Sequence, residues 1–226
     1  MQNDAYHHIT SLIDNIVHTN TIRHHVELVV VTKGQSAESI RQLNAYGQIA
    51  FAESYWQEAK IKQQQLSDLP LEWHFIGRIQ KNKAATIARS FDWVQSVDDP
   101  SMIELMGAAR TACNKPLNIC LQVNISNESQ KGGIPPEDLE KVAALVDRYP
   151  GLKLRGLMAI PARQSCSTQA FKQMNKLFKG LKREYAGIDT LSMGMSDDFE
   201  EAIVEGATML RIGRAIFNDF QSNTRG

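Results

Sequence analysis

Short apolar runs alternate with amphipathic segments along almost the whole chain. The most continuous run begins at Val26, where five of the first six residues are apolar and four of these are β-branched. Such a run is typical of a parallel strand that is covered on both faces. We therefore predict a strand over residues 26–34. The other runs predict strands at about 48–54, 72–77, 92–96, 117–124, 152–158, 188–191 and 208–212.

The segments between these runs carry apolar residues at helical spacing. Ser36 is expected to be the N-cap of one helix, because its hydroxyl can accept an N–H of the first turn. Helices are predicted at about 5–20, 36–45, 55–66, 80–90, 100–112, 135–146, 169–185, 197–205 and from 214 onward. Eight strands alternating with eight helices favour a closed (β/α)8 TIM barrel with an extra N-terminal helix over an open doubly wound sheet. We expect one domain over residues 1–226.

The composition narrows the class of protein. Lys plus Arg and Asp plus Glu number 25 each, so no net charge attracts nucleic acid or an anionic membrane. The three cysteines, Cys113, Cys120 and Cys166, lack metal-site spacing and are expected to be reduced thiols. The N-terminus does not read as a signal peptide, and no apolar stretch is long enough to span a membrane. We therefore expect a soluble cytoplasmic protein without a metal site.

Lys33 follows the most apolar strand and is the first candidate for chemistry. Partial burial at the end of that strand would lower the pKa of its amine and free the amine to form a Schiff base with an aldehyde. The alternative is a lysine that only closes the strand. In a barrel of this kind, function lies at the carboxyl ends of the strands. The other polar groups expected there are Glu53, Ser54, His74, Asn124, Ser192 to Asp198 and Arg211 to Arg214.

The loops after the seventh and eighth strands are suited to phosphate. Such loops commonly bind phosphate in these barrels, with the help of a helix N-terminus. The seventh loop is rich in Gly and Ser and reaches Ser196, which is alternatively an ordinary N-cap, and the eighth strand ends at Gly213. A phosphate site facing an amine across the barrel mouth suggests pyridoxal 5'-phosphate as the cofactor.

Six motifs in order carry a resemblance to a known family. They are residues 31–33, 52–58, 73–83, 154–158, 191–198 and 208–213. On these motifs the sequence closely resembles the YggS/PROSC family of pyridoxal phosphate homeostasis proteins, related to the barrel domain of bacterial alanine racemase. The resemblance implies that Lys33 is the Schiff-base lysine and that Arg211 faces the pyridine nitrogen. It also implies that Ser196 and the Gly213–Arg214 backbone hold the phosphate. Other expected contacts with the cofactor are Ser54, His74, Asn124 and Met195.

The chain departs from the family pattern at several positions. Ala52 and Ser54 replace a glycine and an asparagine, and Ser54 is the poorer two-way hydrogen-bonding partner. Arg78 replaces a proline. Arg214 replaces a threonine, and its guanidinium could reach the phosphate or pair with an aspartate of the seventh loop; we expect partial participation. Lys131, in a glycine-rich loop, is a secondary candidate for binding the aldehyde.

Three functions fit these residues. An arginine at the ring nitrogen leaves the ring unprotonated and a weaker electron sink, which favours a non-enzymatic carrier over an enzyme. We expect a monomeric carrier without catalytic residues that takes part in vitamin B6 homeostasis and contacts apo-enzymes transiently. The second function is a small pyridoxal-phosphate-dependent racemase or lyase, although racemases of this type add a second domain with a tyrosine base. The third is a Schiff-base aldolase acting through Lys33 on a sugar phosphate.

Overall fold

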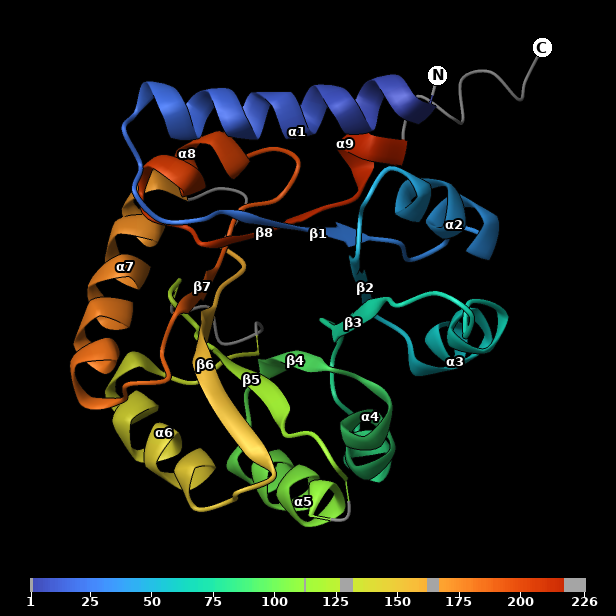
Figure 1. The fold of residues 1–226 in the computed structure, drawn as a ribbon. Helices are drawn as coiled ribbons and strands as arrows, with labels where there is room; N and C mark the ends of the chain where they lie inside the picture. Colours follow the sequence, from blue (N-terminus) through green and yellow to red (C-terminus); the bar gives the residue numbers. More distant parts are fainter. Residues whose placement is uncertain (1, 112, 127–131, 162–166, 218–226) are drawn as a thin grey trace.

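The computed structural model describes residues 2–111, 113–126, 132–161 and 167–217. Eight parallel strands form a closed barrel in chain order, and β8 pairs with β1 to close it (Figure 1). The predicted barrel is confirmed. Its strands are β1 Glu27–Val31, β2 Ala50–Glu53, β3 Glu72–Phe75, β4 Trp93–Val97, β5 Leu117–Gln122, β6 Leu152–Met158, β7 Thr190–Ser192 and β8 Met209–Ile212.

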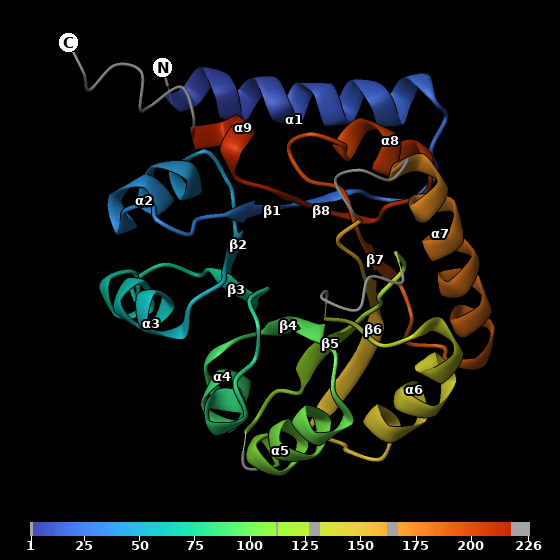
Figure 2. The same cartoon turned by 180° about the vertical axis from the view of Figure 1, so that it is seen from behind.

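Helices surround the barrel, and one of them does not belong to a strand–helix repeat. The N-terminal helix α1 lies along α8 and α9, as the two opposite views show (Figures 1 and 2). The extra helix predicted from the sequence is therefore confirmed. The helices are α1 Gln2–Thr19, α2 Ala37–Ala45, α3 Trp56–Gln65, α4 Ala84–Ser90, α5 Pro100–Arg110, α6 Leu139–Asp147, α7 Ser167–Glu184, α8 Phe199–Val204 and α9 Arg214–Phe217. None of these helices has the length and apolar character that a membrane crossing requires.

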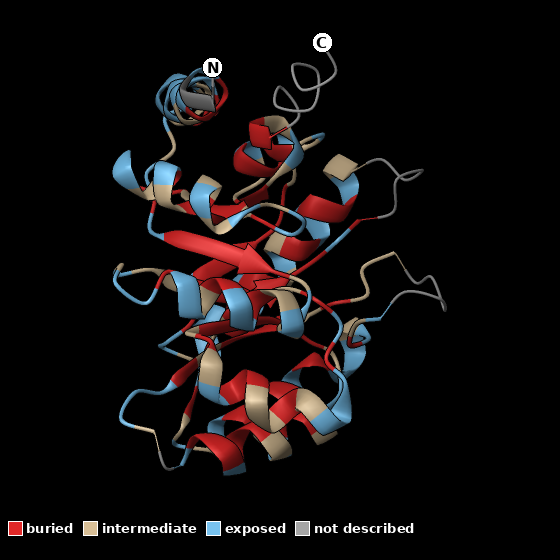
Figure 3. Ribbon diagram, turned by 90° about the vertical axis from the view of Figure 1, so that its right-hand side faces the viewer, coloured by how far each residue is buried: buried red, intermediate tan, exposed pale blue. Residues whose placement is uncertain are grey.

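The strands are buried on both faces, and the helices expose their outer faces (Figure 3). On β1, Val29 and Val30 point to opposite faces and are both fully buried, as the apolar run predicted. Each contributes about 1.5–3 kcal/mol of hydrophobic stabilisation. Outside the barrel the strands pack on the helices. Inside it lies a smaller apolar cluster of Val29, Ala50, Ala52, Trp93, Cys120, Met158 and Met209.

Several elements begin or end at residues other than those that the apolar pattern predicted. The strand predicted over 26–34 ends at Val31. The helices predicted from 80 and 135 begin with the 3-10 turns η1 Lys81–Lys83 and η2 Pro136–Asp138. The hydroxyl of Ser36 accepts the Ser39 N–H at 3.1 Å, which confirms that N-cap. Reading Ser196 as an N-cap is wrong, because α8 begins at Phe199.

Candidate functional site

Lys33 lies on a tight turn just beyond the carboxyl end of β1. The N–H of Gln35 donates to the carbonyl of Thr32 at 2.9 Å, and Gly34 between them has a φ of 75°. Glycine suits this position because a side chain disfavours positive φ. The turn carries Lys33 out of the strand, and its side chain is exposed. The expectation that the end of the strand buries this amine is therefore wrong.

Among the described residues, the buried amine at this end of the barrel belongs to Lys62 on α3, which is only 5% exposed. Its Nζ donates to the carbonyl of Thr32 at 2.7 Å and to Oε1 of Glu53 and of Glu58 at 2.6 and 2.5 Å. Sequence reasoning missed this residue because α3 is polar overall. One signal was available. Ala59, Lys62 and Leu66 recur at helical spacing and are all buried, so Lys62 occupies an apolar-face position.

Glu53 is the buried carboxylate of this cluster. Its Oε1 accepts from Lys62 and from the Thr32 hydroxyl, the latter at 2.6 Å. Its Oε2 has no hydrogen-bond partner within the described residues. Burial raises the pKa of Glu53, and the bonds from Lys62 and Thr32 oppose that rise. The polar cluster therefore links the end of β1 to the end of β2 and to α3.

Arg211 on β8 is a cation inside the barrel, with 3% of its surface exposed. Its guanidinium donates to the Ser192 hydroxyl at 2.6 Å and to the Ala159 carbonyl at 2.9 Å. Burial lowers its pKa to about 10, so Arg211 still carries its charge at neutral pH. Within the described part of the chain, no carboxylate forms an ion pair with it.

A line of hydrogen bonds continues from Arg211 across the barrel. The Ser192 hydroxyl donates to Oε1 of Gln95 at 2.6 Å, and Nε2 of Gln95 contacts Nδ1 of His74 at 2.8 Å. Nε2 of His74 contacts Glu72 at 2.9 Å. His74 was predicted to contact the cofactor. The structure places it in the fully buried interior, with both ring nitrogens engaged and its ring stacked on Trp93.

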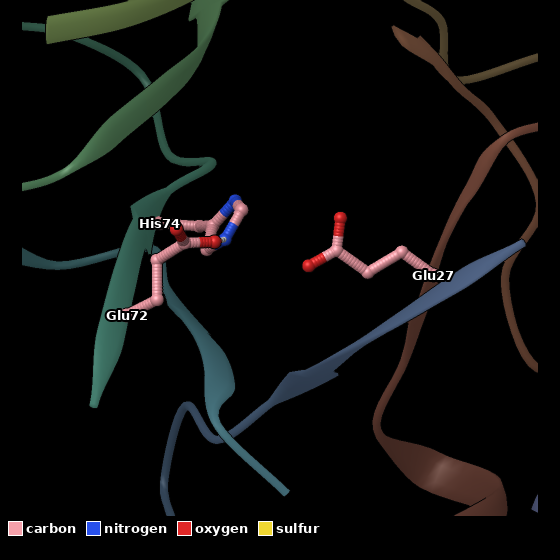
Figure 4. A group of neighbouring side chains, drawn as sticks. All are labelled: Glu27, Glu72 and His74. Carbon is pink, nitrogen blue, oxygen red and sulfur yellow. Dashed lines mark hydrogen bonds and ion pairs between the residues drawn. The ribbon is translucent and has the colours of Figure 1, made fainter. Parts of the chain in front are cut away.

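Two carboxylates lie where this line reaches the amino ends of the barrel strands. Figure 4 shows Glu27 extending from β1 toward Glu72 and His74 on β3. The hydrogen bond from His74 lowers the pKa of Glu72. Burial raises the pKa of Glu27. This end of the barrel lies opposite the strand ends where the other candidate residues gather, so the interior line joins the two ends.

The phosphate candidates lie on the loops after β7 and β8. The Ser196 hydroxyl accepts the N–H of Ala215 in α9 at 3.2 Å, which ties the two loops together. A Cβ on Gly213 would lie 2.7 Å from the Val31 carbonyl, so only glycine allows β8 to approach β1 here. Arg214 is exposed and pairs with Asp197. The N–H of Met195 donates to Asp198 at 2.7 Å, so the backbone of Met195 helps to fix the conformation of this loop.

The remaining candidates are more dispersed. Ser54 follows β2 and is half-buried, and the chain at Gly77 passes so close that a Cβ there would lie 1.9 Å from the Ser54 carbonyl. Asn124 follows β5, and its N–H donates to the Ile134 carbonyl at 3.0 Å. Arg78 is exposed in the loop after β3. Lys131 lies outside the described residues.

Comparisons with known proteins agree with the fold. The family model described as alanine racemase, N-terminal domain, matches residues 8–220. A pyridoxal phosphate homeostasis protein of Pseudomonas aeruginosa is 49% identical over 195 residues, covering 85% of this chain and 84% of that protein. A protein of the same name from Escherichia coli K12 is 43% identical over 225 residues, covering 95% of this chain and 96% of that protein.

A solved structure shares both fold and sequence. PipY of Synechococcus elongatus, in its structure with pyridoxal phosphate bound, superposes with a TM-score of 0.79. It is 32% identical, and the match covers 91% of this chain and 99% of that one. Together with the two bacterial relatives, this match confirms the resemblance found in the six motifs. The chain belongs to the alanine racemase N-terminal domain family, among the relatives named pyridoxal phosphate homeostasis proteins.

Proposed function

We propose that this protein binds pyridoxal 5'-phosphate at Lys33 and takes part in intracellular vitamin B6 homeostasis. The observation that carries the proposal is the pairing of β1 with β8, which closes the barrel. It sets Arg211 beside Val29 and Ile212 beside Val30, so Gly213 lies next to the end of β1 that leads to Lys33. The pairing therefore supports a site made of the turn that carries Lys33, the buried guanidinium of Arg211 and the loop proposed to hold the phosphate.

The side chains fit the chemical groups of this cofactor. Pyridoxal phosphate supplies an aldehyde that condenses with a primary amine, together with a phosphate and a ring nitrogen. The exposed Lys33 offers the amine on a turn with fixed backbone. The Ser196 hydroxyl and the backbone around Gly213 would hold the phosphate. Arg211 stays protonated at working pH and would donate a hydrogen bond to the ring nitrogen.

The function proposed is that of a carrier rather than an enzyme. A carboxylate beside the ring nitrogen would favour the protonated ring and strengthen it as an electron sink. Within the described residues Arg211 forms no ion pair with a carboxylate and is held by neutral groups, Ser192 and Ala159. The curated relatives are likewise named homeostasis proteins. These observations support a protein that holds the cofactor and releases it.

An amino-acid racemase or lyase is the second candidate. Tyr55 favours it, since this tyrosine follows the end of β2 and is 64% exposed at the same end of the barrel as Lys33. A phenol there is a possible proton carrier for such an enzyme. Exchange of the α-proton of alanine and serine in deuterated water separates the two functions. Enzyme-like exchange that disappears in Lys33→Ala would establish the enzyme, and its absence supports the carrier.

The binding itself is tested by absorbance and by reduction. Addition of pyridoxal phosphate to the purified protein should produce a visible absorption band. Borohydride reduction followed by peptide mapping should place the label on Lys33, with the exposed Lys60 as an internal control. Absence of the band, or a label confined to other lysines, would reject the proposal. The aldolase hypothesis fails if the band forms.

The setting of this function is also a proposal. We propose that residues 1–226 act as one domain and as a monomer in the cytoplasm, with pyridoxal phosphate as the ligand. Apo forms of pyridoxal phosphate enzymes would be transient partners. Sedimentation analysis with and without cofactor tests the monomer. Activation of an apo-enzyme by the loaded protein, compared with an equal amount of free cofactor, tests delivery.

A further inference from the structure

Lys62 is fully engaged as a hydrogen-bond donor. An ammonium group has three N–H donors and no acceptor. Nζ of Lys62 contacts three acceptors, the Thr32 carbonyl, Glu53 and Glu58, at 2.5–2.7 Å. All three donors are therefore used. Lys62 is accordingly not a second nucleophile competing with Lys33 for an aldehyde.

The three contacts converge on the turn that carries Lys33. Lys62 binds the carbonyl of Thr32, the residue before Lys33. The N–H of Gly34, the residue after Lys33, donates to Oε1 of Glu58 at 2.6 Å. That same oxygen accepts the Lys62 ammonium. The peptide groups on both sides of Lys33 are thus fixed to one buried cation, directly on one side and through Glu58 on the other.

Glu53 also stabilises the turn that carries Lys33. It accepts from the Thr32 hydroxyl and from Lys62 with one oxygen, so side chain and carbonyl of Thr32 are both fixed. The Lys33 side chain, in contrast, is exposed. Its backbone is therefore anchored while its amine stays accessible. Because a loose attachment point would let the amine sample many unproductive positions, anchoring raises the probability of a productive approach.

We propose that Lys62 and Glu58 are positioning residues that hold the Lys33 turn for reaction with the aldehyde of the cofactor. The proposal rests on the proposed role of Lys33. Neither residue is expected to touch the cofactor. Their contribution is to the rate and affinity of capture at Lys33, and it is separate from the phosphate loop, which lies on β7 and β8.

The test compares variants of α3 in the full-length protein. Glu58→Ala removes the acceptor for the Gly34 N–H, whereas Glu58→Gln keeps an acceptor without the charge. Lys62→Met removes the ammonium but retains most of the apolar stem. Lys60→Met and Gln57→Ala alter exposed residues of the same helix and serve as matched controls. Capture rates are measured by absorbance with pyridoxal phosphate and with pyridoxal, which lacks the phosphate.

We expect Glu58→Ala and Lys62→Met to capture both aldehydes roughly tenfold or more slowly, since bonds to charged groups are the strong ones. Glu58→Gln should recover part of the loss, and the two controls should match the wild type. Competition by inorganic phosphate should be unchanged, because the phosphate loop is untouched. A merely structural role would instead weaken phosphate competition and capture together.

The outcomes separate this inference from the proposed function. If the wild type binds at Lys33 and Glu58→Ala captures both aldehydes at the wild-type rate, the positioning role is rejected and the binding function stands. If reduction of the wild type places no label on Lys33, both are rejected. Should Lys62→Met fail to fold because Glu53 is left without its cation, Glu58→Ala decides the question, since Glu58 is only half-buried.

Discussion

Two cations at the barrel illustrate opposite ways of presenting a charged side chain. Lys33 is exposed on a turn, and its backbone is held by a buried ion-pair cluster. Arg211 is buried on a strand, and its guanidinium itself is held by Ser192 and Ala159. A group that must meet an incoming molecule needs access. A group that sets the polarity of a fixed partner needs a fixed direction.

The two regions also differ in how their polar groups are satisfied. Around Lys62 the bonds join opposite charges, Lys62 with Glu53 and Glu58. From Arg211, the hydrogen bonds continue across the barrel through the neutral side chains of Ser192 and Gln95. The line ends at Glu72. Loss of one partner in either region leaves a buried group unsatisfied, which is the expensive case. We therefore expect the loss of a buried partner in either region to affect stability, and loss of the exposed Lys33 amine to affect capture alone.

The largest effect is expected from Lys33→Ala. This variant should lose covalent binding of pyridoxal phosphate completely and show no visible band. Its stability should stay within about 0.5 kcal/mol of the wild type, because the side chain is exposed. Absorbance and thermal unfolding measure the two quantities on one sample. A visible band of wild-type intensity in this variant would contradict the contrast between the two cations.

Gln95→Leu should have the reverse profile. It removes the partner of the Ser192 hydroxyl and of His74, so we expect a loss of about 2–4 kcal/mol in the free energy of unfolding. Capture at Lys33 should be little changed. Urea unfolding and absorbance check both. Gln122→Leu, which removes a solvent-exposed bond to Gly132, is the control and should cost far less.

Two variants at the amino end of the barrel test how the interior carboxylates change stability with pH. Burial raises the pKa of Glu27, so the folded state holds its proton more tightly than the unfolded state, and stability falls as pH rises through the folded pKa. Glu27→Gln should therefore raise Tm by a few degrees at pH 7.5 and by nothing at pH 4.

Glu72 should respond with the opposite sign. The bond from His74 lowers its pKa, so its stabilisation is present at neutral pH and is lost as pH falls through the folded pKa. Glu72→Gln should lower Tm at pH 7.5 and have less effect at pH 4. Thermal scans at the two pH values measure all three proteins. Shifts of equal sign for Glu27→Gln and Glu72→Gln would show that the two carboxylates do not differ as described.

The smallest effect is expected from Arg214→Thr. Arg214 pairs with Asp197, and both side chains are more than half exposed, so the pair contributes little. The affinity for pyridoxal phosphate should stay within about twofold of the wild type at low and high salt. A clearly weaker affinity with a shallower salt dependence would instead show that this guanidinium binds the phosphate.

The sequence could predict the barrel but not the depth of each side chain at its mouth. Continuous apolar runs such as that of β1 and cap residues such as Ser36 are local signals, and both predictions are confirmed. Whether Lys33 is buried depends on a turn that begins at Thr32, and one residue decides which way a side chain points. Helical spacing places Lys62 on the buried face of α3, but its contacts with Glu53 and Thr32 are contained in no local pattern.

The interior line was equally inaccessible to pattern reasoning. Gln95 and Ser192 are polar side chains within strands, and alternation alone places them inside the barrel without indicating a partner. Their contacts join residues 97 positions apart. Arg211 was predicted by the family resemblance, and its two partners became visible only in three dimensions. The binding role of the site residues stays a prediction.

The thiol of Cys120 is a nucleophile that a protein proposed to bind an aldehyde has to keep unreactive. This thiol lies inside the barrel, fully buried, and burial raises its pKa to about 12. At neutral pH only roughly one molecule in 10⁵ therefore carries the thiolate, which is the form that attacks electrophiles. A cysteine inside the barrel is thus chemically silent toward the aldehyde that the proposed function would bring to Lys33. In that proposal, selectivity for one amine would depend as much on an unreactive thiol as on an accessible lysine.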